Sequence, residues 1–343
     1  MFIYNCGGRG GSVFMITIKD VAKKAGVSIT TVSRVVNNSP RVSKKTREKV
    51  VKAMKELGFS PRPWAKYLAM PRANFKVGVV ITKRIKRFMG KGSFYHLILD
   101  GINEVASSSG VKVEVIMYGE EEKSLDGYLL IGADFGPNDV EKFTSMKKPV
   151  VLVDNHIPGL NVDVVISDGY GGAFNAVQTL INYGYKRIVH IHSPLSTYSF
   201  RDRFNGYVDA MEKNNLMPKV YEFDDIAENM TYVIDLMLNT YGVPEAIFTS
   251  NDFAATRAIK ELRKRGIKVP EDVAIMGFDD SREAKEMNFS SVRVFKKEMG
   301  SFSMRRLATL MMGQDVHPAK ISLYTEPVIR GLIKNLRRRG DVL

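Results

Sequence analysis

The feature that most constrains the fold is an alternation of short apolar segments with helical segments, which begins at residue 77. The apolar segments are rich in Val and Ile and cover residues 77–81, 111–117, 127–132, 150–155, 162–167, 187–192, 246–250 and 273–278. Segments of helical period lie between or after them, at about 94–108, 172–183, 203–214, 229–241, 252–265 and 297–312. Buried strands that alternate with helices predict parallel sheets covered on both faces, and this number of strands favours two doubly wound α/β subdomains.

Composition excludes several classes of protein. Of the 343 residues, 44% are hydrophobic, which is ordinary for a globular chain of two or three domains. No stretch approaches the about 18 apolar residues of a membrane span, and the start lacks the apolar run of a signal peptide. A single cysteine excludes an internal disulfide framework. We therefore expect a cytoplasmic protein with no membrane partner.

The positive charge is concentrated near the N-terminus. Residues 15–74 contain nine Lys and five Arg against three acidic residues, which is a net charge of +11 out of +14 for the chain. A small basic module on a nearly neutral body is typical of a protein that binds a polyanion. Residues 1–14 have no periodicity and include GGRGG, so we expect a disordered tail there, with Met15 as a candidate start.

The basic module contains three short segments of helical period. Thr17 and Ser28 are suited to cap the first two helices, and Gly26 ends the first. The third helix begins at Ser43. A tight turn containing glycine between the first two helices predicts a helix-turn-helix domain over residues 15–60.

The second helix, ITTVSRVVN, has the side chains that a DNA-reading helix needs. If Val32 and Val35 are buried, the opposite face presents Thr30, Ser33, Arg34 and Asn37. Arg34 can bond guanine through two N–H groups, and Ile29 can pack on a thymine methyl group. We expect further contacts to phosphates at the helix N-termini from Thr17, Ser28 and Thr31. The alternative is an ordinary solvated polar face.

Residues 17–61, TIKDVAKKAGVSITTVSRVVNNSPRVSKKTREKVVKAMKELGFSP, resemble the DNA-binding domain of the LacI/GalR (lactose-repressor) family of transcription regulators. The resemblance implies a homodimer, usually a repressor, on a pseudo-palindromic double-stranded operator, with Ile29, Thr30 and Arg34 as base readers in the major groove. It also implies that the body, 75–343, resembles type I periplasmic sugar-binding proteins. We place its N-subdomain at about 75–168 and 294–323, and its C-subdomain at about 169–293 and 324–336.

Two open α/β subdomains bind ligands in the crevice at the carboxyl ends of their strands. Residues that directly follow strands or begin the first body helix are therefore our effector-binding candidates, namely Phe94, Tyr95, Ser193, Arg203, Asn251, Asp252 and Asp279. Each has a structural alternative, since Asp252 is also a plausible helix N-cap and surface arginines are usually solvated.

Three short patterns strengthen the resemblance in this region. RxRxxGY matches Arg201 to Tyr207, SND ends at Asp252, and GFDD contains Asp279. The resemblance implies that Arg203 and Asp279 hold effector hydroxyl groups. Carboxylate and guanidinium groups suit a polyhydroxylated ligand, so we predict a sugar or sugar derivative that controls sugar-utilisation genes.

Two segments depart from the family pattern. The long basic segment TKRIKRFMGKGSFYH, 82–96, is interpreted as a solvated loop, and the competing hypothesis is an anionic effector such as a sugar phosphate or uronate. GEEEKSLD, 119–126, is too short for the full helix that the family has between these two strands.

The segment 61–74 joins the basic module to the body. It contains the only tryptophan and three prolines, and Ser60 precedes it. A helix of about seven residues is unstable alone in water, so we expect order there only on DNA. The resemblance implies a hinge helix that packs on the minor groove, with Leu68 inserted between base pairs and Ala65 as the close-contact residue.

Other functions have weaker support in the sequence. His190 and His192 share a strand face, but no third ligand is apparent, so packing or hydrogen bonding is the commoner role and we predict no metal site. No Gly-x-Ser-x-Gly elbow, Walker loop or His-Glu-x-x-His motif is present, so we predict no enzyme, no catalytic residue and no cofactor. The competing functions, a solute-binding protein and a sugar-modifying enzyme, leave the basic module without a role.

Overall fold

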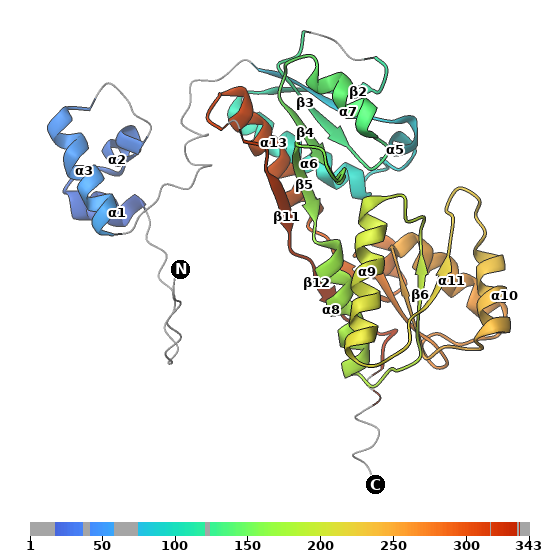
Figure 1. Ribbon diagram of the computed structural model, residues 1–343. Helices are drawn as coiled ribbons and strands as arrows, with labels where there is room; N and C mark the ends of the chain where they lie inside the picture. Colours follow the sequence, from blue (N-terminus) through green and yellow to red (C-terminus); the bar gives the residue numbers. More distant parts are fainter. Residues whose placement is uncertain are drawn as a thin grey trace. The chain divides into compact units, whose positions relative to one another are not determined.

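The computed structural model describes residues 18–36, 42–57, 75–120, 124–315, 317–334 and 336. The chain forms two compact units, Met1–Ala73 and Asn74–Leu343, and each is considered by itself (Figure 1). The expected tail and hinge, including Ala65 and Leu68, lie outside the described residues.

The N-terminal unit is a three-helix domain made of α1 (Ile18–Ala25), α2 (Ile29–Val36) and α3 (Lys44–Glu56). Gly26 takes a φ of 64°, a left-handed conformation that suits glycine, and separates α1 from the turn before α2. Its small core consists of Val21, Ala22, Val32, Val35, Val50 and Ala53. The prediction that Val32 and Val35 face inward is confirmed, and so is the helix-turn-helix arrangement.

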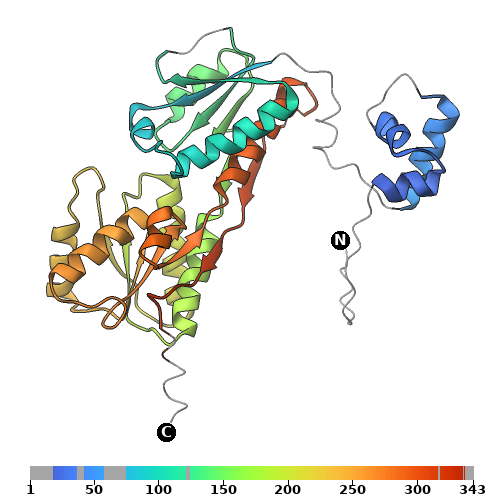
Figure 2. The ribbon, with the colours of Figure 1, turned by 180° about the vertical axis from the view of Figure 1, so that it is seen from behind.

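The first subdomain of the body has a parallel six-stranded sheet in the order β11-β5-β4-β3-β1-β2. The strands are β1 (Lys76–Ile81), β2 (Lys112–Met117), β3 (Gly127–Ile131), β4 (Val150–Val153), β5 (Asp163–Ser167) and β11 (Lys320–Leu323). Alternate strand residues on one face pack against Val140 and Phe143 of α7 (Pro137–Thr144). The helices α6 (Phe94–Ser109) and α13 (Lys296–Met311) pack together on the sheet (Figure 2).

The second subdomain repeats this layout with the strand order β12-β10-β9-β8-β6-β7. Its strands are β6 (Ile188–His192), β7 (Lys219–Glu222), β8 (Ala246–Thr249), β9 (Ala274–Asp279), β10 (Ser290–Arg293) and β12 (Glu326–Val328), of which only β12 is antiparallel to its neighbour. The helices α10 (Met230–Thr240) and α11 (Asp252–Lys264) share a core with β6, β8 and β9. The helices α8 (Gly169–Asn182) and α9 (Tyr198–Lys213) pack together beside β6, β10 and β12. The predicted pair of α/β subdomains with covered parallel sheets is thus confirmed.

The chain passes between the two subdomains three times, after β5, after β10 and between β11 and β12 (Figure 1). The second passage leads into α13, which crosses α6 at very close range. A Cβ atom at Gly101 would lie 1.9 Å from the carbonyl oxygen of Lys297, and one at Gly300 would lie 1.9 Å from that of Ile98. These two glycines therefore permit the close crossing of α6 and α13, whose first residue is Lys296.

Two departures from the sequence expectations matter for the site. The segment expected as a basic loop contains a short helix, α5 (Lys83–Arg87), whose N-cap is Thr82. Helix α9 begins at Tyr198 rather than near residue 203, because Thr197 forms its extended N-cap.

Between β2 and β3, the described residues 118–120 and 124–126 contain no helix, as the short spacing predicted. No described helix has the length and apolarity needed to cross a bilayer.

Candidate effector cavity and DNA-binding helix

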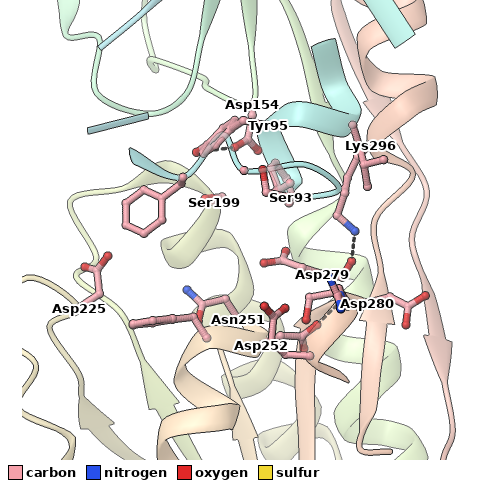
Figure 3. Close-up of a pocket in the computed structure, with 18 of the residues that line it drawn as sticks. Ser93, Tyr95, Asp154, Ser199, Asp225, Asn251, Asp252, Asp279, Asp280 and Lys296 are labelled. Carbon is pink, nitrogen blue, oxygen red and sulfur yellow. Dashed lines mark hydrogen bonds between the residues drawn. The ribbon is translucent and has the colours of Figure 1, made fainter. Parts of the chain in front are cut away.

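A cavity of about 750 Å³ lies between the two subdomains of the body, within the size range of small-molecule sites (Figure 3). We call its two sides the C-wall, made of Arg203, Asn251, Asp252, Asp279 and Asp280, and the N-wall, made of Arg84, Lys91, Ser93, Tyr95 and Asp154. Lys296, at the start of α13, also lines it. The apolar lining includes Phe94, Phe200 and Phe253.

An ion pair between Arg203 and Asp279 forms the centre of the C-wall. Arg203 is only 3% exposed, and its Nη2 lies 3.3 Å from Oδ1 of Asp279. Its Nη1 donates to the carbonyl oxygen of Ser250, and the guanidinium carbon lies 3.8 Å from the ring centroid of Phe278. Nε of Arg203 and Oδ1 of Asp279 are buried atoms that form no hydrogen bond within the described residues. The Asp279 side chain as a whole is 19% exposed, so the carboxylate can still meet a ligand in the cavity.

Asp279 is held in an unusual state. Its φ is 112°, a conformation that residues other than glycine rarely adopt and that is often found at functional sites. Burial raises the pKa of Asp279, and the nearby Arg203 and Lys296 oppose that rise. The carboxylate is therefore kept at the end of β9 in a costly environment that a ligand hydroxyl would relieve.

Asp252 differs from Asp279 because both of its oxygens are already engaged. Oδ2 accepts from the backbone N–H of Ser281 at 2.6 Å, and Oδ1 accepts from the hydroxyl of Ser291 at 2.6 Å. Burial, reinforced by Asp279, raises the pKa of Asp252 to about 7. Asn251 caps α11 by accepting from the N–H of Ala254 at 2.8 Å, which leaves its amide nitrogen for other contacts. Asp252 thus braces the wall, while Asn251 is better placed to contact a ligand.

Ser193 does not line the cavity, which corrects the sequence expectation. It is only 1% exposed, its N–H donates to Oγ of Ser250 at 2.9 Å, and the two hydroxyls lie 3.0 Å apart. The strand β6 ends one residue earlier and directs this hydroxyl toward Ser250. Ser193 therefore supports the residue whose carbonyl oxygen accepts from Arg203.

The N-wall contains a carboxylate that the sequence analysis missed. Asp154 directly follows β4, has a φ of 59° and is buried, and its Oδ2 lies 3.4 Å from the hydroxyl of Tyr95. Burial raises the pKa of Asp154 to about 7, against the lowering effect of Arg203. The signal that identified Asp279, a carboxylate just after a strand, was also present here.

Most of the basic segment before α6 is solvated, as expected, since Lys83, Lys86, Arg87 and Lys91 are exposed. Arg84 is the exception because it is partly buried, and both Arg84 and Lys91 line the cavity. Nε of Arg84 donates to Oδ1 of Asp134 at 2.7 Å. Folding of α5 produces this division, because a helix presents only part of its surface to solvent.

The second helix of the N-terminal unit presents the predicted DNA-contacting face. Ile29 is 47% exposed although it is apolar, and Thr30 and Arg34 are exposed. The hydroxyl of Ser28 accepts from the N–H of Thr31 at 3.1 Å and so caps α2, and it also lies 2.9 Å from the Thr31 hydroxyl. Thr17, Asn37 and the side chain of Ser33 lie outside the described residues.

Both units match known families. The model of bacterial regulatory proteins of the lacI family matches residues 17–62, and that of the periplasmic binding protein-like domain matches 177–331. The HTH-type transcriptional regulator DegA of Bacillus subtilis is 30% identical over 338 residues, covering 92% of this chain and 97% of DegA. The chain belongs to the LacI family.

Further relatives and solved structures agree with this assignment. The repressor CytR of Escherichia coli is 30% identical over 93% of this LacI-family chain and 97% of its own. A complex of the regulator CelR with cellobiose has a TM-score of 0.70 at 28% identity and covers 93% of this chain and all of CelR. The lac repressor dimer bound to operator and an anti-inducer has a TM-score of 0.65 at 27% identity, over 93% and 99% of the two chains. The protein is therefore a DNA-binding transcriptional regulator and not an enzyme.

His190 and His192 of this LacI-family chain pack against each other and against neighbouring aromatic rings. Nδ1 of His190 lies 3.1 Å from the carbonyl oxygen of Phe248, and the imidazole stacks on the Phe248 ring at 4.9 Å. Burial lowers the pKa of His190 to about 3, which keeps the ring neutral. Within the described residues, no group of three or more His, Cys, Asp or Glu side chains is arranged to hold a metal ion.

Proposed function

We propose that the protein represses sugar-utilisation genes by binding a pseudo-palindromic operator as a homodimer, and that a sugar or sugar derivative in the cavity controls this binding. The observation that carries the proposal is the ion pair between Arg203 and Asp279, whose two residues line the cavity between the subdomains. A protein that binds chromosomal DNA works where the chromosome is, so a cytoplasmic location is part of the proposal.

The chemistry of the cavity supports a polyhydroxylated effector. Asp279 can accept from hydroxyl groups, Arg203 can donate to them, and Asn251 adds an amide. The aromatic rings of Phe94, Phe200 and Phe253 offer apolar faces for the C–H surface of a sugar ring. The relative CelR is described in complex with cellobiose.

The exposed face of α2 supports the DNA-binding part of the proposal. Arg34 would read guanine, and Thr30 and Ile29 would contact neighbouring base edges. Ser28 and Thr31, at the N-terminus of the helix, would hold phosphates, as would Thr17 before α1. These contacts give sequence preference through three side chains and general affinity through the basic surface.

Communication between the two sites is proposed to pass through residues 61–74. Effector residues from both subdomains line one cavity, so a ligand binds most tightly to the arrangement in which both walls contact it. The two bodies of the dimer would shift, and their hinge segments would separate. Leu68, the proposed wedge between base pairs, and Ala65, its close-contact neighbour, would then lose the pairing that offsets the cost of unstacking.

A gel-shift titration tests the proposal. Operator candidates are taken from DNA upstream of the gene and mixed with full-length protein, with and without a panel of monosaccharides and disaccharides. We expect retardation that weakens steeply as salt rises and that at least one sugar changes. Absence of retardation on any pseudo-palindromic DNA at low salt would refute the DNA-binding role, and an effector response unchanged in Asp279→Ala would refute the cavity assignment.

An Arg34→Ala variant tests the recognition helix separately. We expect it to lose about 1–3 kcal/mol of discrimination at one base pair in each half-site while it keeps most of its affinity for random DNA. The measurement is competition binding with operators that vary at single positions. Equal losses on operator and random DNA would assign Arg34 to phosphate contact instead.

A further inference from the structure

We propose that the effector carries an acidic group, a phosphate or a carboxylate, which binds between Lys296 and the N-terminus of α6. This inference rests on the proposed function, because it concerns the ligand of the same cavity. It separates an anionic sugar derivative from a neutral sugar, a choice that the proposed function leaves open.

The first observation is the ammonium group of Lys296. Lys296 is 6% exposed and lines the cavity, where its Nζ lies 5.6 Å from the centroid of the Phe94 ring. Nζ donates to the carbonyl oxygen of Asp279 (Figure 3) and to that of Val294. These two bonds use two of its three N–H donors. The third donor has no acceptor among the described residues.

The charge of this ammonium group has no direct partner. Among the residues that the structure describes, no carboxylate forms an ion pair with Lys296, and its nearest acidic neighbours are engaged elsewhere. Asp279 pairs with Arg203, Asp252 accepts from Ser281 and Ser291, and Asp280 pairs with Arg293 and Arg330. Burial lowers the pKa of Lys296, and the carboxylates of Asp279, Asp252 and Asp280 oppose this lowering from beyond ion-pair distance. An anionic ligand group would place a negative charge in direct contact with the ammonium group.

The second observation is the uncapped N-terminus of α6. The N-cap residue is Ser93, but its hydroxyl makes no capping hydrogen bond, and Oγ is a buried atom without any partner. Gly90, Lys91, Gly92 and Ser93 all line the cavity just before this sixteen-residue helix begins. The first N–H groups of a helix and its dipole attract anions, and here they open onto the same cavity as Lys296.

The two observations are independent and concern different helices. Ser93 lies at the start of α6, and Lys296 lies at the start of α13, whose position is fixed by the close crossing at Gly101 and Gly300. A phosphate or carboxylate between them would accept from Lys296 and from the Ser93 hydroxyl. The sugar hydroxyls would then face Asn251, which is neutral, and Asp279, which is acidic.

The test compares matched neutral and acidic ligands on the full-length protein. Calorimetry measures each sugar of the panel, its 6-phosphate and its uronate against wild type, Lys296→Met, Lys296→Arg and Lys297→Met. Lys297 is the control, because it is the next residue of the same helix, is exposed and pairs with Glu104 at 2.9 Å. The 6-phosphate and uronate arms distinguish the two acidic groups.

We expect wild type to bind one acidic ligand at least about tenfold more tightly than its neutral parent, because charge-assisted hydrogen bonds are the strong ones. Lys296→Met should lose this preference, so that its affinity for the acidic ligand falls at least about tenfold more than its affinity for the neutral parent. Lys296→Arg and Lys297→Met should retain the preference. Equal affinity of wild type for neutral and acidic members, or a preference that survives in Lys296→Met, would overturn the inference.

Inorganic phosphate separates this inference from the sugar proposal. If no panel member binds, thermal unfolding is followed while phosphate replaces chloride at constant ionic strength. The general stabilising effect of phosphate and its binding to the basic N-terminal unit are common to all four proteins, so the difference reports on Lys296. A shift reduced in Lys296→Met alone would support the acid site while the sugar assignment fails, and an equal shift in all four would overturn both.

Discussion

The two walls of the effector cavity are built differently. In the C-wall, most polar groups are anchored by one another: Arg203 bonds Ser250 and pairs with Asp279, and Asp252 accepts from Ser281 and Ser291. Only Nε of Arg203 and Oδ1 of Asp279 form no hydrogen bond among the described atoms of these side chains. In the N-wall, the Ser93 hydroxyl has no partner and Asp154 has only a 3.4 Å contact with Tyr95. Arg84, fixed by Asp134, is the exception there.

This difference indicates a division of labour. A wall whose groups are already oriented loses little entropy when a ligand binds, so the C-wall is suited to recognise the common features of the effector. A wall with unsatisfied groups gains most from a ligand that completes its hydrogen bonds. We therefore expect the N-wall, together with Lys296, to determine ligand specificity. We also expect it to supply most of the binding energy that favours the arrangement in which both walls contact the ligand.

The largest expected effect tests whether the C-wall is a braced structure. Asp252→Ala should lower the free energy of unfolding of the body by about 2–4 kcal/mol, since the Ser281 N–H and the Ser291 hydroxyl lose their acceptor inside the protein. Denaturant unfolding measures this. Asp225→Ala, which also changes a carboxylate of the cavity lining, should change stability by less than about 0.5 kcal/mol. Similar losses in the two variants would contradict the contrast between braced and loose residues.

A second prediction concerns the pH dependence of the N-wall. The folded pKa of Asp154 is about 7 against an ordinary value of 3.8, so the folded state holds a proton that the unfolded state releases in this interval. Stability therefore falls as pH rises from about 4 to 7, and Asp154→Asn should remove this part of the fall, on the order of 2–4 kcal/mol. The measurement is the unfolding free energy of both proteins between these pH values.

The shape of the pH dependence tests this assignment to Asp154. Asp252 also has a pKa of about 7, so part of the pH dependence of stability should remain in the Asp154→Asn variant. The difference between the two proteins should be small near pH 4 and should favour the variant increasingly up to pH 7. A constant difference across this range would mean that Asp154 is ionised throughout and is paired more closely than its contacts indicate.

The smallest effect is expected from Tyr95→Phe. The hydroxyl of Tyr95 lies 3.4 Å from Asp154, too far for a strong hydrogen bond, so its removal should cost at most about 0.5 kcal/mol of stability. Effector affinity should fall more than stability does if the N-wall tightens around a ligand. Calorimetry on the effector and thermal unfolding of the free protein give the two values. A larger loss of stability than of affinity would show a wall that is already formed.

Much of the fold could be predicted because its signals are local. The alternation of apolar strands with helices gave parallel sheets, and the period of Val32 and Val35 gave the buried face of α2. The short segment at residues 119–126 correctly predicted the absence of a helix among the described residues there. Each of these inferences needs only a window of about ten residues, within which backbone geometry and hydrophobic period agree.

The site was predicted less completely, and for a physical reason. Six of the seven effector candidates line the cavity, but Ser193 is turned away toward Ser250, because a single residue of displacement at a strand end reverses the side of a side chain. Asp154 and Lys296 were missed, since nothing in their local sequence states that β4 and the start of α13 face the same crevice.

The sequence by itself determined a helix-turn-helix unit on a two-subdomain α/β body, the basic charge of the first and the strand ends that carry polar residues in the second. Only the tertiary structure decided which of those polar groups form hydrogen bonds or ion pairs with one another and which remain able to bind a ligand. Lys296 shows why: it begins α13 beside the close crossing of α13 and α6, and the nearby carboxylates of Asp252, Asp279 and Asp280 are each bonded to other groups. Such balances depend on contacts between segments about 200 residues apart, which local propensity cannot encode.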